Sequence, residues 1–250
     1  FCTFPQSLRR IRRKTFIFIY ILCASKGVLH NMKIRCQKAD LVKGVSIVSK
    51  AVPAKTTMPI LECILIDATT NIIKLTANDM ELGIETVIEG NIEQKGMIAL
   101  DAKIFSDIVR KLPDNEIVIE SDNNLHTLIT CEKAKFNISG KSGDDFSYLP
   151  YIERDEPVII SQFTLKEAIR QTIFSIADND SNKLMTGELF EINGDLLKVV
   201  SLDGHRISIR NIELKGAYNS KKVVVPGKTL IEISKILSGE VDSEVSLYFT

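Results

Sequence analysis

The sequence contains no tryptophan, only three histidines and few aromatic residues overall. A stacking platform for carbohydrate or single-stranded nucleic acid is therefore not favoured. The glycine-rich signatures GxGxxG and GxxxxGKS/T do not occur, so a nucleotide site of either kind has no support. The nucleophile signature GxSxG is also missing. Three dispersed histidines do not form the pattern of a metal triad.

Cysteine is scarce and scattered. The five cysteines are Cys2, Cys23, Cys36, Cys63 and Cys131, and no two of them form a CxxC pair. An odd number without close spacing predicts neither a zinc site nor a disulfide framework. Reduced, dispersed thiols are typical of a cytosolic protein, so we expect a cytoplasmic location and no metal or cofactor.

Charge of one sign does not dominate the chain, whose formal net charge is zero. Residues 1–31 contain six of the 32 basic residues and no acidic one, so the remainder has 26 basic residues against 32 acidic ones. This mildly acidic body argues against a protein that coats DNA through general basicity, but it leaves room for one basic face.

The first 31 residues differ from the rest. Residues 9–14, RRIRRK, and the apolar run at 15–24 have the order of a secretory signal, and the run is short for a membrane span. A regular pattern of strand and helix begins only at Met32. We therefore expect residues 1–31 to be an upstream extension foreign to the native protein. The alternative is a secreted α+β protein that carries them as its signal.

An internal repeat with a period of about 125 residues organises the remaining chain. Each copy contains a helix, a β-meander, a second helix and further strands. This predicts an α+β fold of repeated domains, each with two helices packed on antiparallel sheets. The matching segments are 39–52 with 163–177, 61–79 with 187–204, and 97–113 with 222–238.

The domain boundary is predicted near residues 151–157, where Pro150 and Pro157 bracket a charged segment. We expect one domain at 32–150, a linker at 151–157 and a second domain at 158–250. The second copy lacks a counterpart of residues 123–150, so we expect it to be incomplete and the chain to be a fragment.

Helix starts and buried faces follow from local patterns. Asp40 and Asp101 are predicted N-caps, and Thr164 with Glu167 three residues later is a predicted capping box. The predicted buried face of the helix after residue 101 consists of Ile104, Ile108 and Leu112.

Basic residues recur at helical spacing in both copies of the repeat. Pairs seven or four residues apart lie on one face of a helix, where they are either an ordinary solvated face or a surface that contacts phosphates. Their recurrence in an acidic protein favours phosphate contact. These residues are Lys43, Lys50, Lys103, Arg110, Lys166, Arg170, Lys228 and Lys235.

The stretch SLDGHRISIR at 201–210 suggests an acid and a base in Asp203 and His205. One hypothesis is a cytosolic hydrolase that uses this pair, although no nucleophile signature accompanies it. The simpler interpretation is a tight Asp-Gly turn. Asp79 and Glu81 suggest a Mg²⁺ site in the same way, but no further acidic cluster supports it, and a polar strand end is favoured.

From Met32 onward, the chain resembles the family of bacterial sliding clamps, the β subunits of DNA polymerase III. That family has three repeated domains per chain, and two chains close head to tail into a ring. The resemblance implies a non-catalytic processivity factor that encircles duplex DNA without sequence specificity and forms a homodimer when complete, with no membrane partner. The matching segments are MPIL (58–61), LTANDMELGIE (75–85), LPDNEIVI (112–119), GELFE (187–191), VVSLDGHRISI (199–209) and VVVPGKTLIEISKIL (223–237).

The resemblance also implies sites. A groove for short peptides from the polymerase catalytic subunit, the clamp loader and other clamp-binding proteins is expected, with an apolar pocket that anchors the peptide. Further contacts with DNA are expected at Lys55, Asn179, Lys183 and Lys228, and the ring interface at Phe136 and Ile138. The implied groove residues are Met185, Leu202, Gly204, His205, Arg206 and Ile207.

Overall fold

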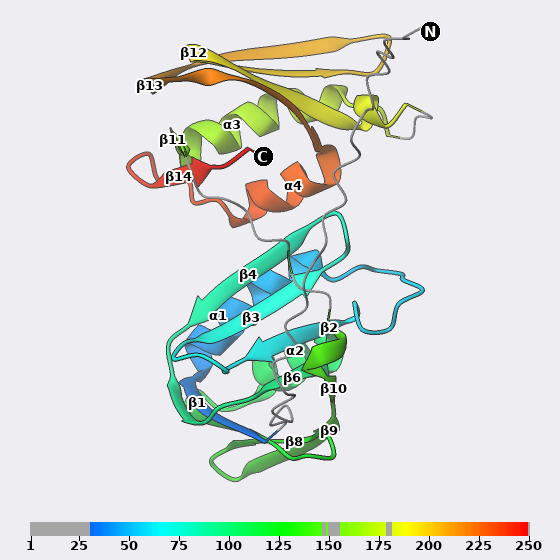
Figure 1. Cartoon of the computed structure of the whole chain (residues 1–250), viewed down its shortest axis with the longest axis vertical. Helices are drawn as coiled ribbons and strands as arrows, with labels where there is room; N and C mark the ends of the chain where they lie inside the picture. Colours follow the sequence, from blue (N-terminus) through cyan, green and yellow to red (C-terminus); the bar gives the residue numbers. More distant parts are fainter. Residues whose placement is uncertain (1–30, 147–148, 150–155, 179–181, 250) are drawn as a thin grey trace, which may run out of the picture.

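The computed structural model describes residues 31–146, 149, 156–178 and 182–249. Two domains lie one above the other along the longest axis of the molecule (Figure 1), which we call domain I and domain II. The predicted extension up to residue 30, most of the predicted linker and Asn179 lie outside the described residues. The α+β fold with repeated domains is confirmed.

Domain I contains two antiparallel five-stranded sheets and two α-helices. One sheet has the strand order β5-β1-β7-β8-β9 and the other β10-β6-β2-β3-β4. The helices are α1 (Lys38–Val48) and α2 (Ala102–Lys111), and a 3₁₀ turn, η1 (Ser49–Ala51), follows α1. The strands are β1 (Met32–Gln37), β2 (Cys63–Asp67), β3 (Ile73–Asn78), β4 (Gly83–Ile88), β5 (Asn91–Gln94), β6 (Met97–Asp101), β7 (Glu116–Ser121), β8 (His126–Cys131), β9 (Ala134–Ser139) and β10 (Lys141–Ser142).

The larger of two hydrophobic core clusters in domain I joins both helices to both sheets. Leu41 of α1 and Phe105 of α2 are fully buried in it, and each such side chain stabilises the fold by roughly 1.5–3 kcal/mol. Gly44 permits the close approach of α1 to the sheet, since a Cβ there would lie 2.6 Å from the Cγ2 of Ile88. This packing fixes which face of α1 remains exposed.

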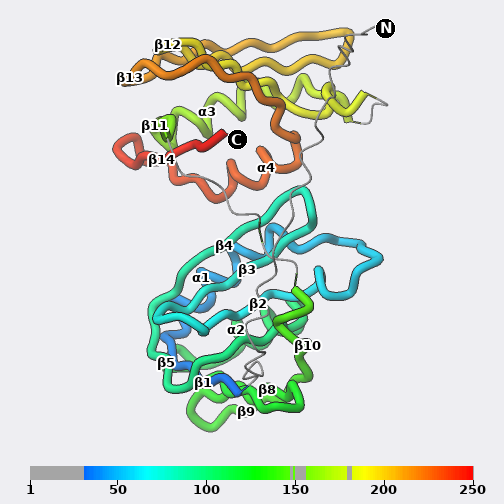
Figure 2. Tube along the Cα trace, viewed as in Figure 1, coloured from blue at the N-terminus to red at the C-terminus, as the bar shows by residue number. Residues whose placement is uncertain are grey.

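Domain II repeats the plan with fewer strands among the described residues. Helices α3 and α4 contact each other and lie beneath the long, bent strands β12 and β13 (Figures 1 and 2). Strand β11 pairs with β14 in a second, two-stranded sheet. The elements are β11 (Val158–Ser161), α3 (Gln162–Thr172), η3 (Ile173–Ser175), η4 (Lys183–Thr186), β12 (Gly187–Leu202), β13 (Ile207–Pro226), α4 (Gly227–Ile236) and β14 (Glu244–Leu247).

The strand registers define the repeat more sharply than the sequence does. Cys63 pairs with Asp101 in domain I, and Gly187 pairs with Pro226 in domain II, so the meander begins at positions 124 residues apart. The sequence comparison aligned Leu61 with Gly187 instead, two residues too early. The predicted turn at 193–195 falls where the register of β12 shifts, and Gly194 there has a φ of +63°.

Two predicted helix caps are wrong and one is confirmed. Asp101 caps α2, accepting a hydrogen bond from the backbone N–H of Ile104 at 2.8 Å. Asp40, however, lies within the first turn of α1, and Thr164 lies inside α3, which begins at Gln162. Glu167 pairs with Arg170 rather than with a cap.

The reason for both errors is tertiary. The backbone N–H of Lys38 donates to the carbonyl of Asn115, and that of Gln162 donates to the carbonyl of Ser243. A neighbouring chain segment therefore satisfies the first amide of each helix, which places Asp40 and Thr164 within the first helical turn. Ile104 was predicted to be buried, but it is exposed. Phe105 and Val109 pack into the core instead, beside Ile108 and Leu112.

Candidate functional site

The turn between β12 and β13 is closed by Asp203. Its Oδ1 accepts hydrogen bonds from the backbone N–H groups of His205 (3.0 Å) and Arg206 (3.1 Å), while Oδ2 accepts from Nε of Arg206 at 2.8 Å. The hydrogen bond from the N–H of His205 is the main cause that holds the pKa of Asp203 below its ordinary value. Gly204 has a φ of +88°, which favours glycine. This is an Asx-type turn built by local chemistry.

The same turn occurs in domain I, 124 residues earlier. Oδ1 of Asp79 accepts from the N–H groups of Glu81 (3.0 Å) and Leu82 (2.7 Å), as Asp203 does at its own turn. Since domain I has no histidine at this turn, an aspartate closes the turn whether or not a histidine follows it. The hydrolase hypothesis is therefore not favoured.

Asp79 does not behave as a metal ligand either, because its second oxygen is occupied by a lysine. Nζ of Lys228, at the start of α4, lies 2.5 Å from Oδ2 of Asp79 and joins the two domains. Burial alone would raise the pKa of Asp79, but the hydrogen bond from Lys228 and those from the turn N–H groups bring it below its ordinary value. Among the described residues, no group of three or more His, Cys, Asp or Glu is placed to hold a metal ion.

The contact between Lys228 and Asp79 is expected to orient the domains and to add some stability. The Lys228→Met variant should lower the free energy of unfolding by about 1–3 kcal/mol, because the Asp79 side chain is only 5% exposed and would lose the cation at its second oxygen. The distribution of angles between the domains should broaden, which small-angle scattering measures. A scattering curve identical to that of the wild type would contradict an orienting role. Lys235→Met, which breaks a pair within α4, is the matched control.

The predicted groove residues lie on segments that contact one another. Met185 is part of η4, and its carbonyl accepts from the N–H of Ala177 at 2.9 Å. Leu202 and Ile207 flank the Asp203 turn and are 37% and 60% exposed. Exposed apolar side chains indicate a binding surface only where several of them form one patch.

Three further exposed apolar side chains on these segments were missed from the sequence. Phe174 of η3, Leu184 of η4 and Ile209 of β13 are each more than half exposed. Their segments are tied together, since the hydroxyls of Ser175 and Ser208 lie 2.6 Å apart. No periodic pattern singles these residues out, because each lies in a short turn or on the open face of a strand.

The basic residues fall into two groups. Lys43, Lys103 and Arg110 are exposed on α1 and α2 and form no salt bridge with another described residue. The same is true of Lys55, in a loop, and of Lys183, the first residue of η4. The other basic residues either bond to groups of the protein itself or lie beyond the predicted helix. Arg170 pairs with Glu167, Lys235 with Glu232, Lys228 with Asp79, Lys166 donates to the carbonyl of Leu237, and Lys50 lies half-buried in η1 beyond the end of α1.

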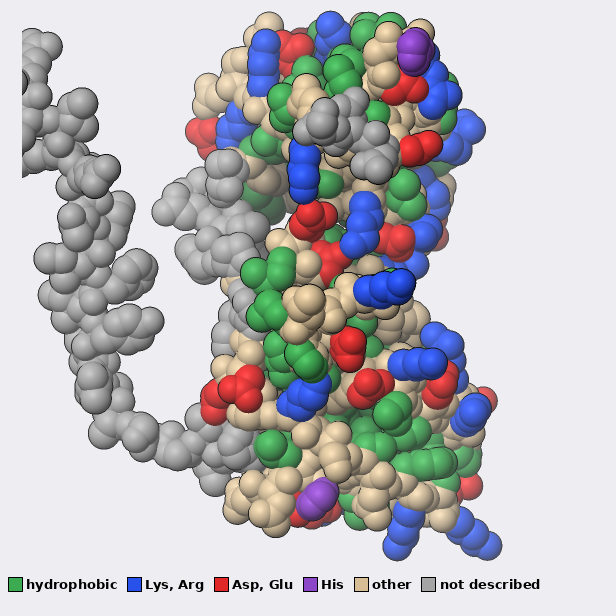
Figure 3. Space-filling view, turned by 90° about the vertical axis from the view of Figure 1, so that its right-hand side faces the viewer, with side chains coloured by type: hydrophobic (Ala, Val, Ile, Leu, Met, Phe, Trp, Pro, Cys, Tyr) green, Lys and Arg blue, Asp and Glu red, His purple; other side chains and the backbone are tan. Residues whose placement is uncertain are grey.

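Surface charge is mixed on the face shown in Figure 3, where Lys and Arg side chains are spread over both domains with Asp and Glu among them. A shallow hollow of 250 Å³ between η1 and α2 is lined by Lys103, Ser106 and Arg110. Lys103 and Arg110 of α2 thus border this hollow together with Asp107, whereas Lys43 of α1 lies outside it.

Strand β9 lies at the edge of its sheet, paired with β8 on one side only among the described strands. Phe136 and Ile138, the residues predicted for a ring interface, belong to this strand. An edge strand offers its unpaired backbone groups to another chain. The interface itself stays a prediction.

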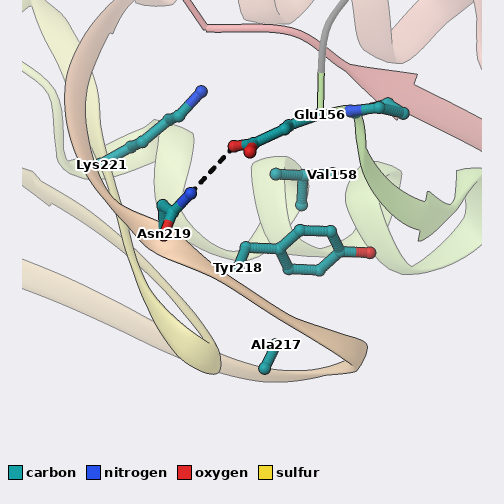
Figure 4. A pocket seen from close by; sticks show the side chains of 7 residues that line it. Glu156, Val158, Ala217, Tyr218, Asn219 and Lys221 are labelled. Carbon is teal, nitrogen blue, oxygen red and sulfur yellow. Dashed lines mark hydrogen bonds between the residues drawn. The ribbon is translucent and has the colours of Figure 1, made fainter.

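A pocket of 490 Å³ opens elsewhere, between β11 and β13 (Figure 4). Glu156 bonds to the amide of Asn219 across it, and the hydroxyl of Tyr218 accepts from the backbone N–H of Ile159. Its lining includes none of the predicted groove or DNA-facing residues. Across the described residues, no helix is long and apolar enough to cross a membrane.

Two copies of one α+β unit, each with paired helices on antiparallel sheets, define the DNA-clamp class of fold. Residues 32–150 match the family model of the DNA polymerase III beta subunit N-terminal domain, and residues 159–250 match that of the central domain. The chain belongs to the DNA polymerase III beta subunit family.

Relatives of known structure and sequence agree with this assignment. The beta sliding clamp of Bacillus subtilis (strain 168) is 39% identical over 215 residues, covering 82% of this chain and 57% of the relative. A crystal structure described as a DNA polymerase III beta subunit from Eubacterium rectale ATCC 33656 is 73% identical with a TM-score of 0.87, covering 88% of this chain and 60% of that one. The B. subtilis clamp structure is 36% identical with a TM-score of 0.85, covering 88% and 60%. The chain thus spans somewhat over half the length of its curated relatives.

Proposed function

We propose that this chain forms part of a ring-shaped, non-catalytic clamp that encircles duplex DNA and tethers a replicative DNA polymerase. The observation that carries the proposal is the match of both domains, in order, to the two family models. A ring holds DNA topologically, so weak contacts between lysine or arginine side chains and phosphates suffice, and they let the ring slide. The unpaired basic residues of α1 and α2 suit this role.

The second part of the proposal concerns partners. The exposed apolar side chains around the Asp203 turn form a surface for short peptides of the polymerase, the clamp loader and other clamp-binding proteins. Met185, Leu202 and Ile207 supply apolar contact, while Arg206 and His205 supply polar groups at its rim. No reaction is assigned to these residues.

Retention on circular DNA tests the clamp function. The native assembly, purified from its source cells, is loaded onto a nicked circular plasmid and passed over a sizing column. It should stay with the circle at moderate salt and be lost once the plasmid is cut once, because an open end lets a ring slide off. Equal retention on circular and linear DNA would show ordinary binding and overturn topological tethering.

A further inference from the structure

Four buried positions differ in polarity between the two domains. They lie around the end of the first helix of each domain, α1 in domain I and α3 in domain II. In domain II they are polar, and each side chain is at most 1% exposed. In domain I the equivalent positions, 124 residues earlier, carry only hydrocarbon and are fully buried. The pairs are Val48 with Thr172, Ala51 with Ser175, Ile64 with Glu188, and Ala77 with Ser201. The fold therefore packs this region without polar groups, and the polarity of domain II needs another explanation.

Glu188 is the member of this group whose burial destabilises the folded protein most. Its Oε1 lies 2.8 Å from the hydroxyl of Thr172, and its Oε2 has no hydrogen-bond partner. A carboxyl group removed from water without a cation or full hydrogen bonding destabilises a protein. Burial raises its pKa to about 7, and the Thr172 hydroxyl opposes this only in part.

The hydrogen-bond geometry around Thr172 suits a neutral carboxyl group. The Thr172 hydroxyl has one proton and lies 2.8 Å from both the carbonyl of Ala168 and Oε1 of Glu188. When Glu188 is protonated, it donates to Thr172, and Thr172 donates to Ala168, so both contacts are satisfied. When Glu188 is ionised, one proton must serve two acceptors.

The same polar group holds both ends of the Asp203 turn. Ser201, the residue before Leu202, donates to the carbonyl of Thr172 at 2.5 Å. Ser208, the residue after Ile207, pairs through its hydroxyl with Ser175. Ser201 and Ser208 are also direct partners across β12 and β13. Side-chain hydrogen bonds therefore tie the two strands that carry the turn to the end of α3 and to η3. In domain I, Ala77 stands in place of Ser201 and cannot form such a bond.

We propose that Thr172, Ser175, Glu188, Ser201 and Ser208 form a polar anchor that fixes the Leu202–Ile207 turn against α3 and thereby sets the affinity of domain II for apolar peptides. The peptide role rests on the proposed function. The anchor residues are positioning residues, since Ser201 and Ser208 flank the turn and the others bond to them or to Thr172. Domain I, which lacks the anchor, has the same Asx turn without this support.

The repeat itself supplies the test. A triple variant, T172V/E188I/S201A, gives domain II the residues that already pack together in domain I. In the 250-residue chain, amide hydrogen exchange at His205 and Arg206 should accelerate about tenfold, because the turn opens locally once its anchor is lost. Exchange at Glu81 and Leu82, the equivalent amides of domain I, should not change. Unaltered exchange at Phe190 and Ile192 shows that domain II remains folded.

Two further measurements separate positioning from general stability. The conservative variant E188Q keeps a hydrogen-bonding group beside Thr172 and should retain wild-type protection at His205 and Arg206. A fluorescein-labelled short peptide with an apolar carboxyl-terminal end should bind the triple variant about tenfold more weakly than the wild type. Unchanged exchange at the turn in the triple variant overturns the anchor. If exchange accelerates but the wild type does not bind the peptide, the anchor stands and the peptide function fails.

Discussion

Replacing Glu188 by isoleucine is expected to remove a steep pH dependence of stability between about pH 4.5 and 7. Burial raises the folded-state pKa of Glu188 to about 7 from an ordinary 4.5. The folded protein therefore binds more protons than the unfolded chain in this range, and the free energy of unfolding falls as pH rises through it. A shift of this size corresponds to roughly 3 kcal/mol. Above pH 7, Glu188→Ile should thus be the more stable protein.

Urea unfolding at several pH values between 4.5 and 8 measures this difference. No charged neighbour causes the pKa shift of Glu188, because its causes are burial and, in the opposite direction, the hydrogen bond from Thr172. Several charged residues on the surrounding elements form pairs of their own, namely Glu167 with Arg170 on α3, Glu191 with Lys222 on β12 and β13, and Glu232 with Lys235 on α4. Glu191→Gln is the matched control, since the hydrogen bond from Lys222 lowers the pKa of Glu191 and the 4.5–7 slope should survive. Parallel pH profiles for Glu188→Ile and wild type would refute the buried, neutral carboxyl.

Neutralising the unpaired basic residues of α1 and α2 is expected to reduce the salt dependence of DNA association. The variant K43A/K103A/R110A removes three exposed charges that no described carboxylate neutralises. If each contacts a phosphate, the slope of log K against log salt concentration should become shallower by about 2.7. Anisotropy of a labelled 30-base-pair duplex, titrated at several salt concentrations, gives this slope.

A control with the same change in net charge separates location from total charge. K95A/K133A/K135A removes three exposed lysines from turns and an edge strand rather than from helices. It should leave the slope nearly unchanged. Equal slopes for both triple variants would mean that net charge alone governs association and that the helices are not the DNA-facing surface.

Features governed by neighbours in sequence were predictable. The N-cap at Asp101 was foreseen, because a carboxylate and the amide three residues later need only the local helix to meet. The turn at Asp203 was foreseen as the structural alternative to catalysis for the same reason. The α+β repeat followed from periodicity over both copies.

Features that depend on distant segments were not predictable. Thr164 and Glu167 have the spacing of a capping box, but α3 begins earlier because the carbonyl of Ser243, the residue before β14, accepts a hydrogen bond from the first helical amide. Lys228 was assigned to DNA by resemblance, yet it pairs with Asp79 from the other domain. Helical spacing likewise did not distinguish Lys103, which is free of described salt bridges, from Lys235, which is paired.

The sequence by itself determined that this protein is a repeat of α+β units with a tight turn at Asp203, since periodicity and local hydrogen bonding act over a few residues. Only the tertiary structure decided what surrounds this turn and its counterpart at Asp79. It brings Lys228 to Asp79 across 149 positions of the chain, and it buries Glu188 where domain I buries Ile64. The physical reason is that burial and pairing are set by contacts between segments far apart in sequence.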